Sequence, residues 1–131
     1  MHSATRQPLT ALGIDLAFVI AFVALGRDTH GDAALVDPVG YLGALWPFGV
    51  SLLLASAAVV VLRGRTDGIA AGLVVWFVTL GGGMLLRAVS GQGTALPFVI
   101  VAAVTLLVTL VGWRLVLAVA RRVRAARAER R

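Results

Sequence analysis

The fold is decided by the stretch ALPFVIVAAVTLLVTLVGWR, residues 95–114. This stretch carries no charge before Arg114. At 1.5 Å per residue, a helix of this stretch is about 28 Å long, which matches the ~30 Å hydrocarbon core of a bilayer. We predict a transmembrane helix here, with Pro97 in its first turn, where a missing N–H breaks no hydrogen bond.

Three more apolar runs precede this stretch and meet the same length requirement. They span residues 9–25, 44–62 and 69–86, and the second begins as early as Val39 if Pro47 lies inside the helix. The chain is 60% hydrophobic and 14% charged, with a mean hydropathy of +0.96, whereas soluble domains carry about 25% charged residues. A chain of 131 residues cannot bury so much apolar surface within itself. We therefore predict an all-α fold, a four-helix transmembrane bundle over residues 9–114.

The arginines indicate the orientation in the membrane. All 12 basic residues are arginine, and six of them lie in the tail between Arg121 and Arg131. With four spans the termini share a side, and Arg6, Arg63 and Arg65 fall on that side too. Since short loops rich in arginine stay in the cytoplasm, we predict a multi-pass protein of the cell membrane with both termini cytoplasmic.

The two ends of the chain lie outside the predicted spans. Residues 1–8 form the cytoplasmic N-terminus, and residues 115–131 form a basic tail without glycine or proline. An amphipathic helix at the membrane surface is indicated by apolar residues at three- or four-residue spacing opposite many arginines: Val116, Val119, Val123 and Ala126. A frayed, solvated tail beyond Ala120 is the alternative. The expected partner is anionic lipid and not nucleic acid, because no soluble recognition module accompanies the arginines.

The four spans form two similar helix hairpins. The first has Leu25-Gly26-Arg27 at its corner and Pro47-Phe48 in its return helix, and the second has Leu86-Arg87 and Pro97-Phe98. Each half thus has an arginine at its outer corner and a Pro-Phe pair that opens the return helix. Chance similarity between two apolar hairpins is the alternative interpretation.

Asp15 is the only acidic residue within a predicted span. It lies about 9 Å along the first span, and an acid at that depth faces the bundle interior, a partner or water. Arg114 lies at a similar depth on the last span, so we predict an Asp15–Arg114 ion pair, with Arg63 as second choice. The alternative is a protonatable carboxylate that couples transport to proton movement. An internal acid also argues against a cleaved signal peptide over this run.

A second polar cluster is predicted at the outer surface from Arg27, His30 and Arg87. His30 has only nearby acids as companions, which is a poor ligand set, so we expect no metal. Two arginines near helix ends suit an anion or a lipid headgroup. A solvated loop, with the arginines bonded to neighbouring helix ends, is the alternative.

Five glycines at the start and the end of the third span predict close helix packing: Gly68, Gly72, Gly81, Gly82 and Gly83. Small residues let membrane helices approach each other, and Gly68 with Gly72 is spaced to pack against residues 55–58 of the second span. A hinge or a substrate groove at the glycine triplet is the alternative.

The chain lacks the residues that catalysis requires. No set of nucleophile, base and orienting group stands out, and there is no cysteine. We expect no enzymatic activity and no cofactor. The leading interpretation is a structural or interaction component that assembles with itself or with a membrane complex. A small proton-coupled transporter or channel that uses Asp15 is the first alternative, and lipid or headgroup binding through the outer arginines is the second.

Short motifs follow one another between Asp15 and Arg114. They are Gly26-Arg27, His30-Gly31, Pro47-Phe48, Trp76, Gly83-Met84, Arg87, Pro97-Phe98, Val101-Ala102 and Gly112-Trp113-Arg114. In this order they resemble domain-of-unknown-function family 3054, a family of small four-span membrane proteins. The resemblance implies a four-helix membrane protein and no established activity, and it leaves out the N-terminus and the arginine tail. From these motifs we expect this functional polar set: Asp15, Arg27, His30, Arg87 and Arg114.

Overall fold

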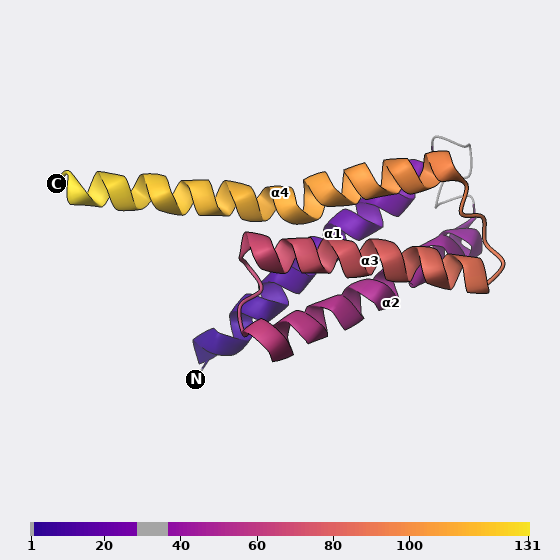
Figure 1. Ribbon diagram of the computed structural model, residues 1–131, viewed down its shortest axis with the longest axis horizontal. Helices are drawn as coiled ribbons and strands as arrows, with labels where there is room; N and C mark the ends of the chain where they lie inside the picture. The colour runs from indigo at the N-terminus through magenta and orange to yellow at the C-terminus, as the bar shows by residue number, and fades with distance from the viewer. Residues whose placement is uncertain (1, 29–36) are drawn as a thin grey trace.

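The computed structural model describes residues 2–28 and 37–131, with side chains for residues 6–27 and from residue 37 onward. This part of the chain forms four α-helices and no strand: α1 (His2–Asp28), α2 (Pro38–Arg63), α3 (Ile69–Val89) and α4 (Leu96–Glu129). The helices alternate in direction (Figure 1). Both termini and the α2–α3 connection therefore lie at one end, the proximal end. At the opposite, distal end α1 and α3 finish. The predicted all-α fold is confirmed.

All four helices are long and apolar enough to cross a membrane. Their outer faces carry large apolar side chains, among them Leu62 (79% exposed) and Phe77 (70% exposed). Exposed apolar surface of this extent requires lipid as its solvent. The predicted four-helix transmembrane architecture is therefore confirmed.

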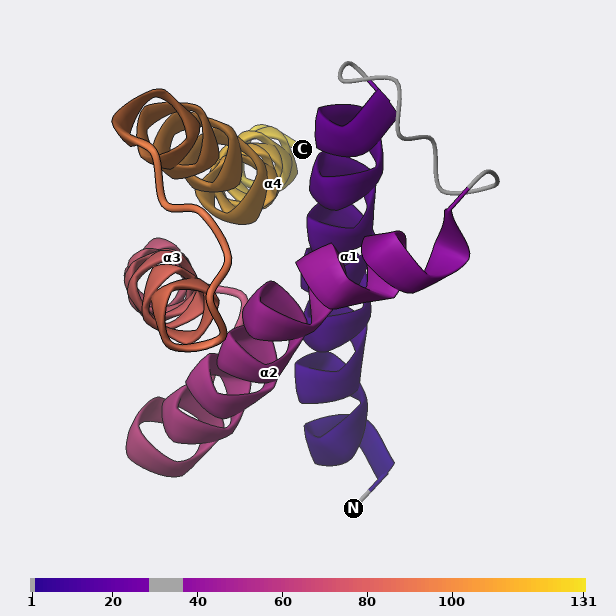
Figure 2. The ribbon, with the colours of Figure 1, turned by 90° about the vertical axis from the view of Figure 1, so that its right-hand side faces the viewer.

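Each helix packs against two others, so the bundle is a closed ring in the order α1, α2, α3, α4. Figure 2 looks at the distal end and shows α3 and α4 on one side, α1 on the other, and α2 crossing between them. The core takes apolar side chains from every helix, including Val19, Leu52, Val75 and Leu106, each at most 1% exposed. The ring brings the first and last helices side by side.

The second helix begins earlier than its predicted start at Ala44. It starts at Pro38, after the N-cap residue Asp37, whose carboxylate accepts a backbone N–H from the first turn at 2.9 Å. The expectation that Pro47-Phe48 opens this helix is wrong, because the pair lies inside α2. The corresponding pair Pro97-Phe98 does lie in the first turn of α4.

Pro47 is tolerated inside α2 because a side chain replaces the hydrogen bond that it cannot make. Proline has no N–H to donate to the carbonyl four residues back, which is that of Gly43. The amide Nε2 of Gln92, in the α3–α4 connection, donates to Gly43 O at 3.0 Å. Figure 2 shows α2 changing direction along its length, as an interior proline requires.

Two glycines of α3 make the close helix contacts predicted for them. A Cβ at Gly82 would lie 2.6 Å from Ser51 Oγ, and a Cβ at Gly83 would lie 2.5 Å from Phe48 Cδ1. Real side chains do not tolerate such distances, so α2 and α3 reach this separation only because both positions are glycine.

The close packing predicted for Gly68 and Gly81 is wrong, and so is the partner predicted for Gly72. Gly68 is the N-cap residue of α3, and a Cβ at Gly68 or Gly81 would meet nothing within 4 Å. Gly72 is closely packed, but against Arg114 of α4 and not against residues 55–58 of α2. The spacing of the glycines gave no information on which helix faces them.

The last helix continues past the predicted end of its span without a break. Its 34 residues correspond to about 51 Å, well beyond a ~30 Å hydrocarbon core. Figure 1 shows its C-terminal part projecting beyond the other three helices. This part, residues 115–129, is termed the basic arm. The predicted basic helical extension is confirmed, and the frayed alternative beyond Ala120 is wrong; contact of the arm with the membrane surface stays a prediction.

The α2–α3 contact predicts opposite effects of the same substitution at two glycines. Gly83→Ala should lower stability by about 1–3 kcal/mol, because the buried ring of Phe48 cannot move away from the new methyl group. Gly81→Ala is the matched control and should raise stability by about 0.5–1 kcal/mol, since it only removes backbone freedom. Thermal unfolding in detergent, followed by circular dichroism, measures both. Equal midpoints for the two variants would contradict the packing described for α2 and α3.

Candidate functional site

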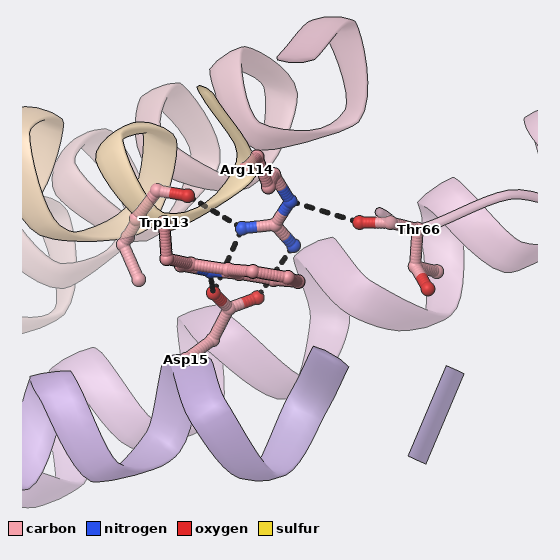
Figure 3. A network of polar contacts seen from close by, with 5 residues as sticks. Asp15, Thr66, Trp113 and Arg114 are labelled. Atoms are coloured by element: carbon pink, nitrogen blue, oxygen red, sulfur yellow. Dashed lines mark hydrogen bonds and ion pairs between the residues drawn. The ribbon is translucent and has the colours of Figure 1, made fainter. Parts of the chain in front are cut away.

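Asp15 and Arg114 form a two-pronged ion pair between α1 and α4. Arg114 Nη1 donates to Asp15 Oδ1 at 2.8 Å, and Arg114 Nη2 donates to Asp15 Oδ2 at 2.7 Å (Figure 3). The two side chains are 1% and 0% exposed. Parallel donors on both carboxylate oxygens are the strongest arrangement for such a pair. The structure thus brings together the two residues that sequence reasoning paired, whereas Arg63, the second choice, is exposed.

The remaining donors of Arg114 are bound to backbone carbonyls. Its Nε donates to Thr66 O in the α2–α3 connection at 2.8 Å, and Nη1 also donates to Leu110 O, one turn earlier in α4, at 2.6 Å. A guanidinium has five N–H donors, and four of them are therefore used. A buried arginine with so few free donors is held in one position.

Trp113 is part of the same network. Its Nε1 donates to Asp15 Oδ1 at 2.8 Å, and its ring lies 4.4 Å from Arg114 Cζ. Figure 3 shows the ring alongside the carboxylate and the guanidinium. Sequence reasoning named Trp113 only in the Gly112-Trp113-Arg114 motif and missed this role; the signal was its position next to Arg114.

The space for Arg114 is created by Gly72 of α3. A Cβ at this position would lie 2.7 Å from Arg114 Cδ and 3.3 Å from Leu110 O. Only glycine leaves room for the arginine stem between α3 and α4. The ion pair of α1 and α4 is therefore also a contact with α3.

Asp67 forms a second polar contact at the proximal end, which sequence reasoning missed. Its side chain is 4% exposed, and Oδ2 lies 2.6 Å from Arg121 Nη1 on the basic arm. Oδ1 lies 3.5 Å from Arg65 Nε. Burial raises the pKa of Asp67, but contact with Arg121 and then the charges of Arg121 and Arg65 lower it more, so the pKa lies below its ordinary value. The only signal in the sequence was an acid in a short loop among arginines.

The outer arginines make contacts of their own at the distal end. Arg27 Nη2 pairs with Asp37 Oδ2 at 2.9 Å. Arg87 donates from Nε and Nη2 to Gly93 O at 3.2 and 2.9 Å, and from Nη1 to Gln92 Oε1 at 3.0 Å. Arg87 thus fixes the α3–α4 turn. His30, predicted to join them, lies outside the described residues. In the part of the chain with described side chains, no three potential metal ligands lie together.

The fold and the buried ion pair define the class: a small multi-pass membrane protein whose first and last helices are joined by a buried ion pair. Its residues 12–117 match the model of a family described as "Protein of unknown function (DUF3054)". This match covers most of the chain, so the protein belongs to that family, as the motifs predicted. No curated protein and no solved structure matches the chain. The matched range includes the Asp15–Arg114 pair and the outer arginines Arg27 and Arg87, and it ends before Arg121.

Breaking the Asp15–Arg114 pair should destabilise the bundle strongly. Asp15→Asn keeps the shape of the side chain but leaves the charge of Arg114 buried and unpaired, which costs about 3–5 kcal/mol. Thermal unfolding in detergent measures this loss. Joint replacement by Asp15→Leu and Arg114→Met should cost less than Asp15→Asn alone, because no buried charge remains.

The same variant tests whether Asp15 is a transport residue. A reconstituted Asp15→Asn protein that kept the unfolding midpoint of the wild type, and lost a proton-coupled flux that the wild type shows, would contradict the structural role of the pair.

The contact between Asp67 and Arg121 predicts a pH-dependent contribution to stability. The pKa of Asp67 is lower in the folded than in the unfolded chain, so the stabilisation is complete above the unfolded pKa, about 3.9, and is lost as the pH falls through the folded pKa. Asp67→Asn should cost about 1 kcal/mol at neutral pH, since Arg121 is half exposed and water screens the pair. Unfolding midpoints of the variant and the wild type should converge below about pH 4. A difference that stays constant between neutral and acidic pH would contradict this role.

Proposed function

We propose that the protein is a non-enzymatic component of the cell membrane whose bundle holds the basic arm in contact with the anionic lipids of the cytoplasmic leaflet. The observation that carries the proposal is that span and arm are one continuous helix, α4. Two ion pairs support its proximal half, Asp15–Arg114 within the bundle and Asp67–Arg121 beyond it. The arm therefore has a direction set by the bundle and is not a loose tail.

The position of the arginines suits contact with lipid headgroups. Arg114 is bonded to Thr66 in the α2–α3 connection, which supports a position of Arg114 near the proximal membrane surface. Arg121, Arg122 and Arg124 follow about 10–15 Å further along the helix axis, at headgroup depth or just beyond it. Basic residues this close to anionic lipid each contribute about 1 kcal/mol of attraction. The tendency of arginine-rich segments to stay in the cytoplasm supports the orientation with both termini on that side.

The arrangement of Asp15 favours this proposal over proton-coupled transport. Its carboxylate is 1% exposed and accepts hydrogen bonds from Arg114 and Trp113. Protonation during a transport cycle would remove the partner of a buried guanidinium, which is costly. A carboxylate in this setting suits a permanent structural charge.

A fluorescent probe on the arm tests the proposal. The chain has no cysteine, so Ala126→Cys gives one labelling site for an environment-sensitive dye. In nanodiscs that contain phosphatidylglycerol the emission should shift to that of a dehydrated probe, and it should not do so in phosphatidylcholine alone. High salt should reverse the shift.

The matched control is the labelled protein with Arg122→Gln, Arg124→Gln and Arg127→Gln, which leaves Arg121 on Asp67. These substitutions should weaken contact with the anionic surface by about 3 kcal/mol, or roughly a hundredfold. Equal emission in both lipids, or no effect of the substitutions, would contradict the proposal.

A further inference from the structure

A cavity of about 640 Å³ lies at the distal end of the bundle, away from both ion pairs of the proximal end. All four helices contribute to its wall, with Phe22 from α1, Phe48 from α2, Arg87 from α3 and Phe98 from α4 among the lining residues. Its volume is in the range of ligand-binding pockets, about 300–1,000 Å³. A ligand could therefore contact every helix at once.

The apolar part of the cavity is formed by three phenylalanines. The ring centroids of Phe22 and Phe48 are 5.6 Å apart, those of Phe22 and Phe98 are 6.3 Å apart, and those of Phe48 and Phe98 are 6.4 Å apart. Phe22 and Phe48 are buried. Such a wall binds hydrocarbon and excludes a fully hydrated ion.

Arg27 and Arg87 line the same cavity, and both have donors or charge without a matching partner among the described residues. Arg27 pairs with Asp37 through Nη2, but its Nε is buried and has no hydrogen-bond partner among the described residues. The hydrogen bonds of Arg87 go to neutral oxygens, and its Cζ lies 4.6 Å from the ring centroid of Phe98. No described carboxylate pairs with Arg87. A positive charge beside an apolar cavity favours an anionic ligand.

We propose that the distal cavity binds an anionic phospholipid, with an acyl chain among the phenylalanines and the phosphate beside Arg27 and Arg87. An acyl chain accounts for the aromatic wall, and a phosphate accounts for the charge of Arg87 and for the Nε of Arg27 that has no described partner. This site lies at the opposite end of the bundle from the basic arm. It does not rest on the proposed function of the arm, and either can fail without the other.

Native mass spectrometry of the full-length protein tests the site. The protein is delipidated in detergent and then offered dioleoylphosphatidylglycerol or dioleoylphosphatidylcholine at equal concentration. The wild type should retain phosphatidylglycerol at collision energies that remove phosphatidylcholine. Arg27→Gln and Arg87→Gln should each reduce this retention about tenfold or more, the effect of a lost hydrogen bond to a charged group. The control, Arg122→Gln with Arg124→Gln on the basic arm, should retain the lipid as the wild type does.

Arg87→Gln also removes the bonds that fix the α3–α4 turn, so a second variant leaves both arginines in place. Ala44→Phe adds a ring to the cavity wall and should reduce retention of phosphatidylglycerol while the unfolding midpoint without added lipid stays close to that of the wild type. Competition with sodium phosphate separates the lipid from a soluble anion. Inorganic phosphate should not displace the bound phospholipid at equal concentration.

Three results would overturn the proposal. Equal retention of phosphatidylcholine and phosphatidylglycerol would show an apolar site without use of the arginines. Displacement by sodium phosphate at equal concentration would show a soluble-anion site. Retention that is unchanged in both Arg27→Gln and Ala44→Phe, but lost in the arm control, would show that the lipid binds at the basic arm.

Discussion

The fold depends on one buried charge pair, Asp15 with Arg114. Charges this far from water are strongly unfavourable alone, and only their mutual contact and further hydrogen bonds make them tolerable. In lipid there is no hydrophobic force that pulls one apolar helix to another, so polar contacts and close packing decide which helices meet. The pair joins the first helix to the last, and that contact closes the ring of four helices. Among the residues with described side chains, no other ion pair joins α1 to α4.

Other features of the proximal end follow from that pair. Because Asp15 does not use all of its donors, Arg114 also donates to Thr66 O and to Leu110 O in its own helix, and the bond to Thr66 O fixes the α2–α3 connection. The next residue in that connection is Asp67, which then lies within reach of Arg121. The direction of the basic arm is thus coupled to a carboxylate on a different helix through a short chain of bonded groups.

Depth along a helix was predictable from the sequence, and rotation about the helix axis was not. Asp15 and Arg114 were paired correctly because both lie at similar distances from the same membrane surface. The partner of Gly72 was predicted incorrectly, because residue spacing does not show which neighbour a small residue faces. The start of α2 was misjudged for a related reason. Gln92, far along the chain, satisfies the carbonyl that Pro47 leaves without a donor, and no local rule for proline includes such a partner.

The two ends of the bundle differ in the partners of their arginines, and this difference bears on the distal cavity. At the proximal end Arg114 and Arg121 each have a carboxylate partner. At the distal end Arg27 keeps a buried Nε without a described partner, and Arg87 is bonded to neutral oxygens beside a cavity. A ligand gains most free energy where it supplies a missing partner, because that partner offsets a desolvation cost the protein already bears. An anion bound in the distal cavity would give Arg87 the negatively charged partner that it lacks among the described residues.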